Sequence, residues 1–188
     1  MSRRERLNQS QGASIQWRTK ETPMVHVPYF DNAEVELFDD FDESDVQAAE
    51  ALAAFLTLTP ADRLKDSRHV FAYYRDFHEA VGGEDWLDAE MGVPEKPEDI
   101  WDHVTPNEVG VWKGRGEDKH TYIFVEANCA WEAEHGLLLV WRDGKVLNKA
   151  GGFDGHPTNS RAYADDTMAD VVYSASNADY TTRLDPQD

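Results

Sequence analysis

The sequence predicts an α+β domain, in which a mostly antiparallel β-sheet carries a helical hairpin on one face. Three observations support this prediction. Residues 122–127 alternate between two sets of side chains, as residues of a strand do. Residues 137–141 form a short apolar run, and the hairpin-turn signal Asp143-Gly144 follows it. Residues 44–81 instead space their apolar residues as helices do.

The chain divides into three parts by composition. Residues 1–22 are polar and show no sustained period, so we expect a disordered tail. Residues 23–173 are expected to form the single α+β domain. Residues 174–188 are expected to be a frayed C-terminal tail.

The first expected elements are two strands and an acidic run. Residues 24–30 and 34–38 resemble strands, with a turn at Asp31-Asn32 between them. The acidic run 39–45 includes Asp39, Asp40 and Asp42. It does not form a calcium loop, because Asp45 and Ala51 stand where that loop requires glycine and glutamate.

Two helices follow the acidic run. Ser44, with Gln47 closing a capping box, is expected to begin a helix that ends near Leu56. Its expected apolar stripe consists of Val46, Ala49, Leu52, Ala53 and Leu56. The second helix is expected to begin at Thr59-Pro60 and to stop at Gly82-Gly83. His69 and His78 on this helix lack the spacing of a metal-binding pair, and we expect both to be surface or boundary residues.

The second half of the chain is expected to supply most of the sheet. A loop-rich acidic segment, 84–104, is anchored by Trp86, Ile100 and Trp101. The expected strands are 108–112, 122–127, 137–141, 146–150 and 168–173. In the hairpin around Asp143-Gly144, we expect Trp141 to pair with Val146, Val140 with Leu147, and Leu139 with Asn148.

Residues 129–156 resemble a bacterial family of domains of unknown function. The residues that carry the resemblance are the motif Cys-x-Trp-x-x-Glu-His-Gly-Leu at 129–137, Asp143-Gly144, and Asp154-Gly155-His156. The resemblance implies a shared fold and no particular reaction.

Charge and cysteine content exclude several classes of function. The chain has 37 acidic and 18 basic residues, for a net charge of -19. We therefore expect it to bind neither nucleic acid nor an anionic membrane. One cysteine allows no internal disulfide, and the N-terminus lacks a signal-peptide pattern, so we expect a cytoplasmic protein.

The connection 128–136 holds the densest set of reactive side chains, and three interpretations are open. In the first, Trp131 fills the core while Glu134 and His135 bond the irregular backbone. In the second, His135 with Glu132 or Glu134 forms a metal or catalytic site, with Asp154 or His156 added from the following turn. In the third, exposed Trp131 and Glu132 contact a protein partner. Cys129 lacks a cationic neighbour in sequence that would make it a nucleophile.

These observations favour a non-enzymatic binding protein that uses no cofactor and blocks a basic protein, as immunity proteins and inhibitors do. Its expected binding residues are Trp131, Glu132, Asp39, Asp40 and Asp42. The alternative is a metal-dependent enzyme. Its catalytic candidates are His135, Glu134 and Asp154, and its metal-ligand candidates are His135, Glu134 and His156.

Overall fold

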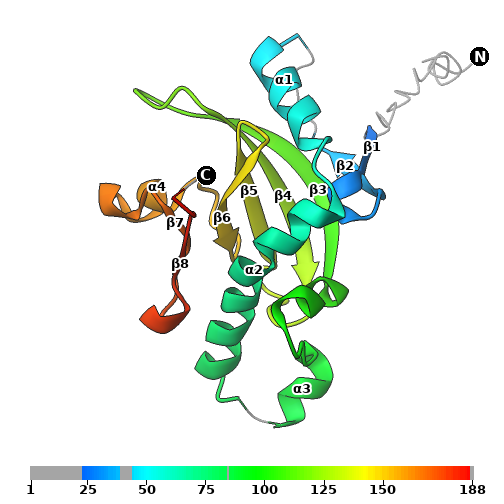
Figure 1. The fold of residues 1–188 in the computed structure, drawn as a ribbon, viewed down its shortest axis with the longest axis vertical. Helices are drawn as coiled ribbons and strands as arrows, with labels where there is room; N and C mark the ends of the chain where they lie inside the picture. The colour runs from blue at the N-terminus through cyan, green and yellow to red at the C-terminus, as the bar shows by residue number, and fades with distance from the viewer. Residues whose placement is uncertain (1–22, 39–43, 84, 187–188) are drawn as a thin grey trace, which may run out of the picture.

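A computed structural model of the chain describes residues 23–38, 44–83 and 85–186. Its centre is a six-stranded sheet in the order β1-β2-β3-β4-β5-β6 (Figure 1). The strands are β1 (Met24–Val27), β2 (Ala33–Leu37), β3 (Val104–Lys113), β4 (Thr121–Cys129), β5 (Leu137–Arg142) and β6 (Val146–Gly151). All neighbouring pairs are antiparallel except β2 and β3, which are parallel. The predicted α+β class with a mostly antiparallel sheet is confirmed.

Most helices occupy the connection between β2 and β3 or the segment after β6, and one 3-10 helix joins β1 to β2. They are α1 (Val46–Phe55), α2 (Pro60–Ala80), α3 (Asp85–Met91) and α4 (Asn159–Tyr163), with the 3-10 helices η1 (Pro28–Phe30), η2 (Pro97–His103), η3 (Asp166–Met168) and η4 (Ala178–Tyr180). A parallel strand pair needs a long crossover, and α1, α2, α3 and η2 supply it. The helix α2 begins at Thr59-Pro60 as predicted, and Thr59 forms a capping box with Asp62.

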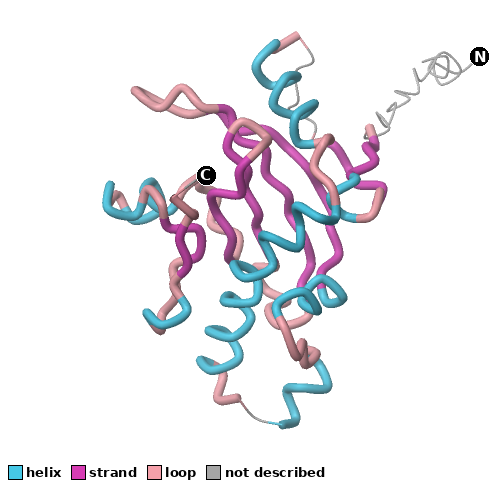
Figure 2. Tube along the Cα trace, in the orientation of Figure 1, coloured by secondary structure: helices cyan, strands magenta, loops and turns pink. Residues whose placement is uncertain are grey.

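The predicted helical pair lies on one face of the sheet (Figure 2). Its first helix, α1, packs mainly on β4, whereas α2 packs on η1, η2, β6 and β7. A second sheet of two short strands, β7 (Val171–Tyr173) and β8 (Thr182–Arg183), lies beside β6. The large core is between the sheet and these helices, and Trp141 at its centre contacts the rings of Tyr29 at 5.1 Å and Phe55 at 4.8 Å.

The central strands have the two-sided burial that the sequence predicts. Ile123, Val125 and Ala127 face the large core. The opposite face carries a smaller cluster of Tyr122, Phe124, Leu138 and Val140, with Trp112 packed against it. Residues 137–141 form the predicted strand, and all five are buried, so this strand is covered on both faces.

The register predicted for the β5–β6 hairpin is wrong by one residue near the turn and by two beyond it. Asp143 and Gly144 have positive φ angles of 52° and 68°, as the predicted turn requires. However, Arg142 pairs with Val146, Trp141 with Leu147, and Val140 with Lys149. Lys145 belongs to the turn, and Asn148 is an extra residue that forms a β-bulge.

The predicted N-cap and the predicted buried face of α1 are also wrong. Asp45, rather than Ser44, is the N-cap, and its carboxylate accepts a hydrogen bond from the Ala48 N–H at 3.0 Å. Lys113 forms an ion pair with the same carboxylate at 2.9 Å, which ties the helix start to β3. The buried side chains are Ala48, Ala51, Leu52 and Phe55, whereas Val46 is 66% exposed. The apolar stripe is therefore rotated from the predicted one.

His69 is a buried residue, not the surface or boundary histidine expected. It is 3% exposed, and its Nδ1 lies 2.7 Å from Thr182 Oγ1 of β8. Burial lowers the pKa of His69 to about 4, with the Arg68 charge acting in the same direction. The sequence pattern of α2 gave no sign of this burial, because the cover comes from a strand more than a hundred residues away.

Two further predictions concern the ends of the chain. Residues 174–186, expected to fray, contain η4 and β8 and contact α2. The tail predicted for residues 1–22 lies outside the described residues, as do Asp39, Asp40 and Asp42.

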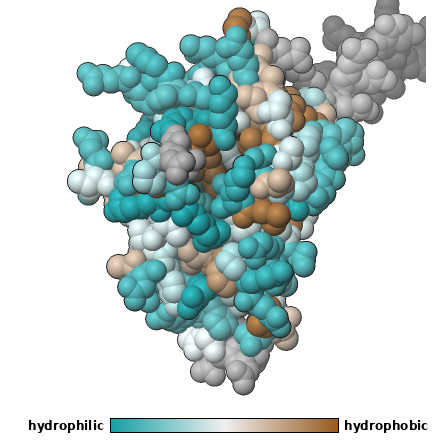
Figure 3. Space-filling model, viewed as in Figure 1, coloured by the Kyte–Doolittle hydropathy of each residue, from teal (hydrophilic) through white to brown (hydrophobic). Residues whose placement is uncertain are grey.

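Among the described residues, no helix combines the length and apolar character needed to cross a membrane. Figure 3 shows that hydrophilic side chains dominate the face that carries α2.

Candidate functional site

The connection from β4 to β5 is a tight loop, residues 130–136, set between two central strands. Gly136 closes it with a φ of 64°, and a Cβ at this position would lie 2.7 Å from the Ala127 carbonyl oxygen. Gly136 therefore occupies a backbone conformation that other residues avoid. This geometry fixes the preceding residues against the end of β4.

Glu132 organises the loop from within. Glu132 is 6% exposed, and its carboxylate accepts hydrogen bonds from the backbone N–H groups of Glu134 at 2.8 Å and His135 at 2.7 Å. The Tyr73 hydroxyl of α2 donates to the same carboxylate at 3.4 Å. Glu132 thus satisfies backbone donors that have no strand partner.

We expect Glu132→Gln to lower the free energy of unfolding by about 2 kcal/mol, because the glutamine amide would turn its NH₂ group toward one of the two backbone N–H donors and leave that donor without an acceptor. Urea denaturation measures this loss. Glu134→Gln is the matched control in the same loop, and it should change stability by less than about 0.5 kcal/mol because the side chain is exposed. Equal effects of the two changes would contradict the structural role of Glu132.

Cys129 and Trp131 are core residues at this loop. The Cys129 thiol donates to the Glu132 carbonyl oxygen at 3.3 Å, and burial raises its pKa to about 12. Trp131 is 3% exposed and contacts the rings of Tyr73 at 5.7 Å and Tyr74 at 6.0 Å. The interpretation that places an exposed Trp131 and Glu132 against a partner is therefore corrected, since both side chains are buried.

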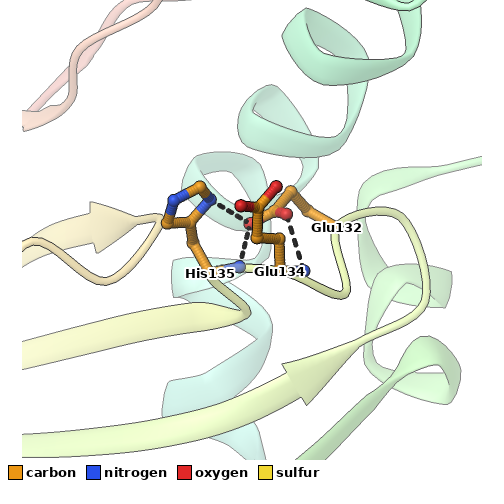
Figure 4. A group of neighbouring side chains, drawn as sticks. All are labelled: Glu132, Glu134 and His135. Atoms are coloured by element: carbon orange, nitrogen blue, oxygen red, sulfur yellow. Dashed lines mark hydrogen bonds and ion pairs between the residues drawn. The ribbon is translucent and has the colours of Figure 1, made fainter.

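Glu134 and His135 are the ionisable residues of the loop that reach solvent, and Figure 4 shows them beside Glu132. His135 Nδ1 lies 3.3 Å from Glu132 Oε2, and its side chain is 60% exposed. One ligand atom each from Glu132, Glu134 and His135 lie within 4.8 Å of one another. Two carboxylates and an imidazole at this spacing can bind a divalent cation, although Glu132 would share lone pairs already used by backbone N–H groups.

A recess of about 220 Å³ opens beside the loop. Its polar lining consists of Glu126, Glu132, Glu134, His135, Asn107 and Asn128, and we call it the acidic recess. No lysine or arginine is among its lining residues in the described chain. Burial raises the pKa of Glu126, as expected for a carboxylate that has lost water without gaining a cation.

Comparison with known proteins places the chain in a family. A model of a domain of unknown function, DUF6985, matches residues 5–157. The chain belongs to the DUF6985 family. No curated protein and no solved structure matches it.

The match to DUF6985 includes the whole β4–β5 loop and the turn at 154–156. In this DUF6985 domain, the turn is separate from the acidic recess. Both oxygens of Asp154 contact Lys149 Nζ, at 2.6 and 2.5 Å, and His156 turns its Nδ1 to the Asp154 carbonyl oxygen at 2.8 Å. Asp154 and His156 therefore do not join Glu134 and His135 in one described cluster, so the three catalytic candidates of the alternative enzyme, His135, Glu134 and Asp154, do not converge.

Sequence reasoning missed part of the acidic recess. Glu126, Asn107 and Asn128 are not among the site residues predicted from the sequence. Asn107 is the extra residue at an irregularity in β3, and its Oδ1 accepts a hydrogen bond from Asn128 at 3.3 Å. A usable signal was that Glu126 and Asn128 alternate along β4 directly before the loop.

Proposed function

We propose that this DUF6985 protein is a non-enzymatic, cytosolic binding domain of the immunity or inhibitor kind. Its acidic recess receives a lysine or arginine side chain from a basic protein partner. The remaining negative charge of the chain, including Asp39, Asp40 and Asp42, steers that partner and raises the rate of association.

One observation carries this proposal: the acidic recess gathers three carboxylates, and none of the described residues that line it is a lysine or arginine. Glu126 sits at its wall with a raised pKa because burial disfavours its charge. A cation in the recess would stabilise that charge and would pair with the exposed Glu134. The acidic recess should therefore bind a cationic side chain more tightly than a neutral one.

A hexa-arginine peptide is a defined probe for this recess. We expect it to shift the backbone NMR signals of Glu126, Glu134 and His135 at low salt, and the shifts should shrink at higher ionic strength. Glu126→Gln/Glu134→Gln should weaken binding about tenfold, because two charges near one cation are lost. Glu34→Gln/Glu50→Gln removes the same net charge from exposed positions of β2 and α1 and should have little effect.

Shifts spread evenly over the acidic surface, or equal losses in the two double variants, would contradict the proposal. Capture of a basic partner that survives in the Glu34→Gln/Glu50→Gln protein and fails in the Glu126→Gln/Glu134→Gln protein would extend it from the probe to a protein.

A metal-dependent enzyme is the second candidate, favoured by the grouping of Glu132, Glu134 and His135. If it is correct, a divalent cation should raise the Tm of chelator-treated protein, because a ligand of the folded state stabilises it by mass action. His135→Ala should abolish the shift, whereas His156→Ala should retain it, since His156 lies outside the group. An unchanged Tm with every divalent cation tested would remove this candidate.

A further inference from the structure

A second recess lies on another part of the molecule, between the β3–β4 connection, the end of β5 and the segment around α4 and η3. Figure 1 shows the β3–β4 connection extending toward the side of the molecule that carries α4. The recess has a volume of about 430 Å³. Its polar lining includes Arg115, Arg142, Arg161, Asn148, Thr158 and Ser160, and we call it the arginine recess.

The three arginines of this recess differ from the other arginines that the structure describes. Arg63, Arg68 and Arg183 form ion pairs with Asp31, Asp185 and Asp170. Arg75 lies over the ring of Tyr180. Within residues 23–38, 44–83 and 85–186, the guanidinium groups of Arg115, Arg142 and Arg161 have neither an ion pair nor a hydrogen bond. In a chain with 37 acidic residues, three such groups around one recess indicate a site for an anion.

Asn148 is an independent observation at the same place. This bulge residue of β6 is 5% exposed, and its Nδ2 donates to the Pro157 carbonyl oxygen at 2.8 Å. Its Oδ1 is buried and has no hydrogen-bond partner in the described chain. A buried acceptor without a partner is costly, so a ligand that brings a hydroxyl or N–H donor would be favoured here.

The acidic groups at the arginine recess reduce its charge without cancelling it. Asp118 and Asp166 also line it, so three arginines against two aspartates leave the lining one charge positive. Asp118 is engaged by the Tyr122 hydroxyl at 3.0 Å and the His120 N–H at 3.0 Å. His120 itself is held by Asp143 at 2.6 Å. The recess is therefore locally positive on a chain whose net charge is -19.

We propose that the arginine recess binds a small organic phosphate that carries hydroxyl groups. Guanidinium groups bind phosphate oxygens in pairs, which suits a dianionic group better than a single carboxylate. The Thr158 and Ser160 hydroxyls, 3.0 Å apart, add further hydrogen-bonding groups. The volume is in the range of small-molecule sites and exceeds what a bare phosphate needs. Asn148 Oδ1 then accepts a hydrogen bond from a ligand hydroxyl.

Isothermal titration at matched ionic strength tests this proposal with ribose 5-phosphate, ADP, pyrophosphate and citrate. Ribose 5-phosphate or ADP should bind with one-to-one stoichiometry and at least tenfold more tightly than citrate. The comparison of these two ligands distinguishes a sugar phosphate from a nucleotide, and weaker binding of pyrophosphate would show the contribution of the hydroxyl groups. Equal affinity for citrate and for both organic phosphates would overturn the proposal.

Arg142→Gln/Arg161→Gln should weaken binding of the preferred phosphate by at least thirtyfold. Lys65→Gln/Lys96→Gln removes the same charge from exposed residues outside the recess and should leave affinity within twofold. Arg115→Gln, at an exposed position of the β3–β4 connection, provides a variant with little risk to folding and should weaken binding severalfold. Unchanged affinity in Arg115→Gln and in the folded double arginine variant would overturn the assignment. Binding of hexa-arginine at the acidic recess is a separate measurement, so either proposal can fail alone.

Discussion

Gly144→Ala is expected to destabilise the fold by more than about 3 kcal/mol, because the new methyl group overlaps the backbone of α1. A Cβ at this position would lie 1.9 Å from the Ala51 carbonyl oxygen and 2.9 Å from the Phe55 nitrogen. These atoms belong to a helix backbone and have no flexible side chain to move aside. Relief requires α1 and the β5–β6 turn to move apart, which disturbs the contact of Phe55 with Trp141 in the large core.

Urea denaturation of Gly144→Ala should be compared with that of Gly116→Ala. Gly116 has nearly the same φ, 70° against 68°, but a Cβ there would meet nothing within 4 Å. The control therefore measures the backbone strain alone, about 1 kcal/mol. The difference between the two variants isolates the clash with α1. If both lose the same stability, the close packing of the β5–β6 turn against α1 is wrong.

The strands of this protein could be predicted because their signals are local. Alternation along residues 122–127 and the apolar run 137–141 each depend on neighbours in sequence, and the structure confirms both. The Asp143-Gly144 turn was also correct, because positive φ angles select residue types directly. The start of α2 was also predicted correctly, because Thr59-Pro60 is a local signal for the first turn of a helix.

The predictions that failed concern features that are set by contacts between distant segments. The bulge at Asn148 shifts the β5–β6 register, and nothing in a single strand reveals an extra residue. The face that α1 buries is set by where the β5–β6 turn and β4 meet it, so an evenly spaced alanine-rich helix could be assigned the wrong stripe. The burial of His69 depends on β8 in the same way.

The β4–β5 loop was located correctly, while the roles within it could not be assigned. Glu132 and Glu134 are alike in sequence, yet Glu132 turns inward to two backbone N–H groups and Glu134 reaches solvent. Which one does so depends on the Gly136 backbone and on Tyr73 from α2. The arginine recess was missed because its residues come from three separate segments, none of which carries a motif.

The second large effect is expected at Asp76, which fastens the segment after β7 to α2. Its buried carboxylate accepts hydrogen bonds from the Tyr173 hydroxyl at 2.8 Å, the Ser176 N–H at 2.8 Å and the Asn177 N–H at 2.9 Å. These partners lie beyond residue 157, where the family match ends. A helix residue inside the family domain therefore holds a segment outside it.

Asp76→Asn should lower the free energy of unfolding by about 3 kcal/mol, because an amide cannot accept from all three donors and turns its own donor toward one of them. Hydrogen exchange at the Ser176 and Asn177 amides should accelerate, since their acceptors are disturbed. Tyr173→Phe is the matched control. It removes one donor and leaves both backbone bonds, so it should cost about 1 kcal/mol and leave exchange at those two amides slow. Unchanged exchange in Asp76→Asn would show that β8 and the other contacts with α2 hold the segment without this carboxylate, and that the hydrogen bonds to Asp76 contribute little to its attachment.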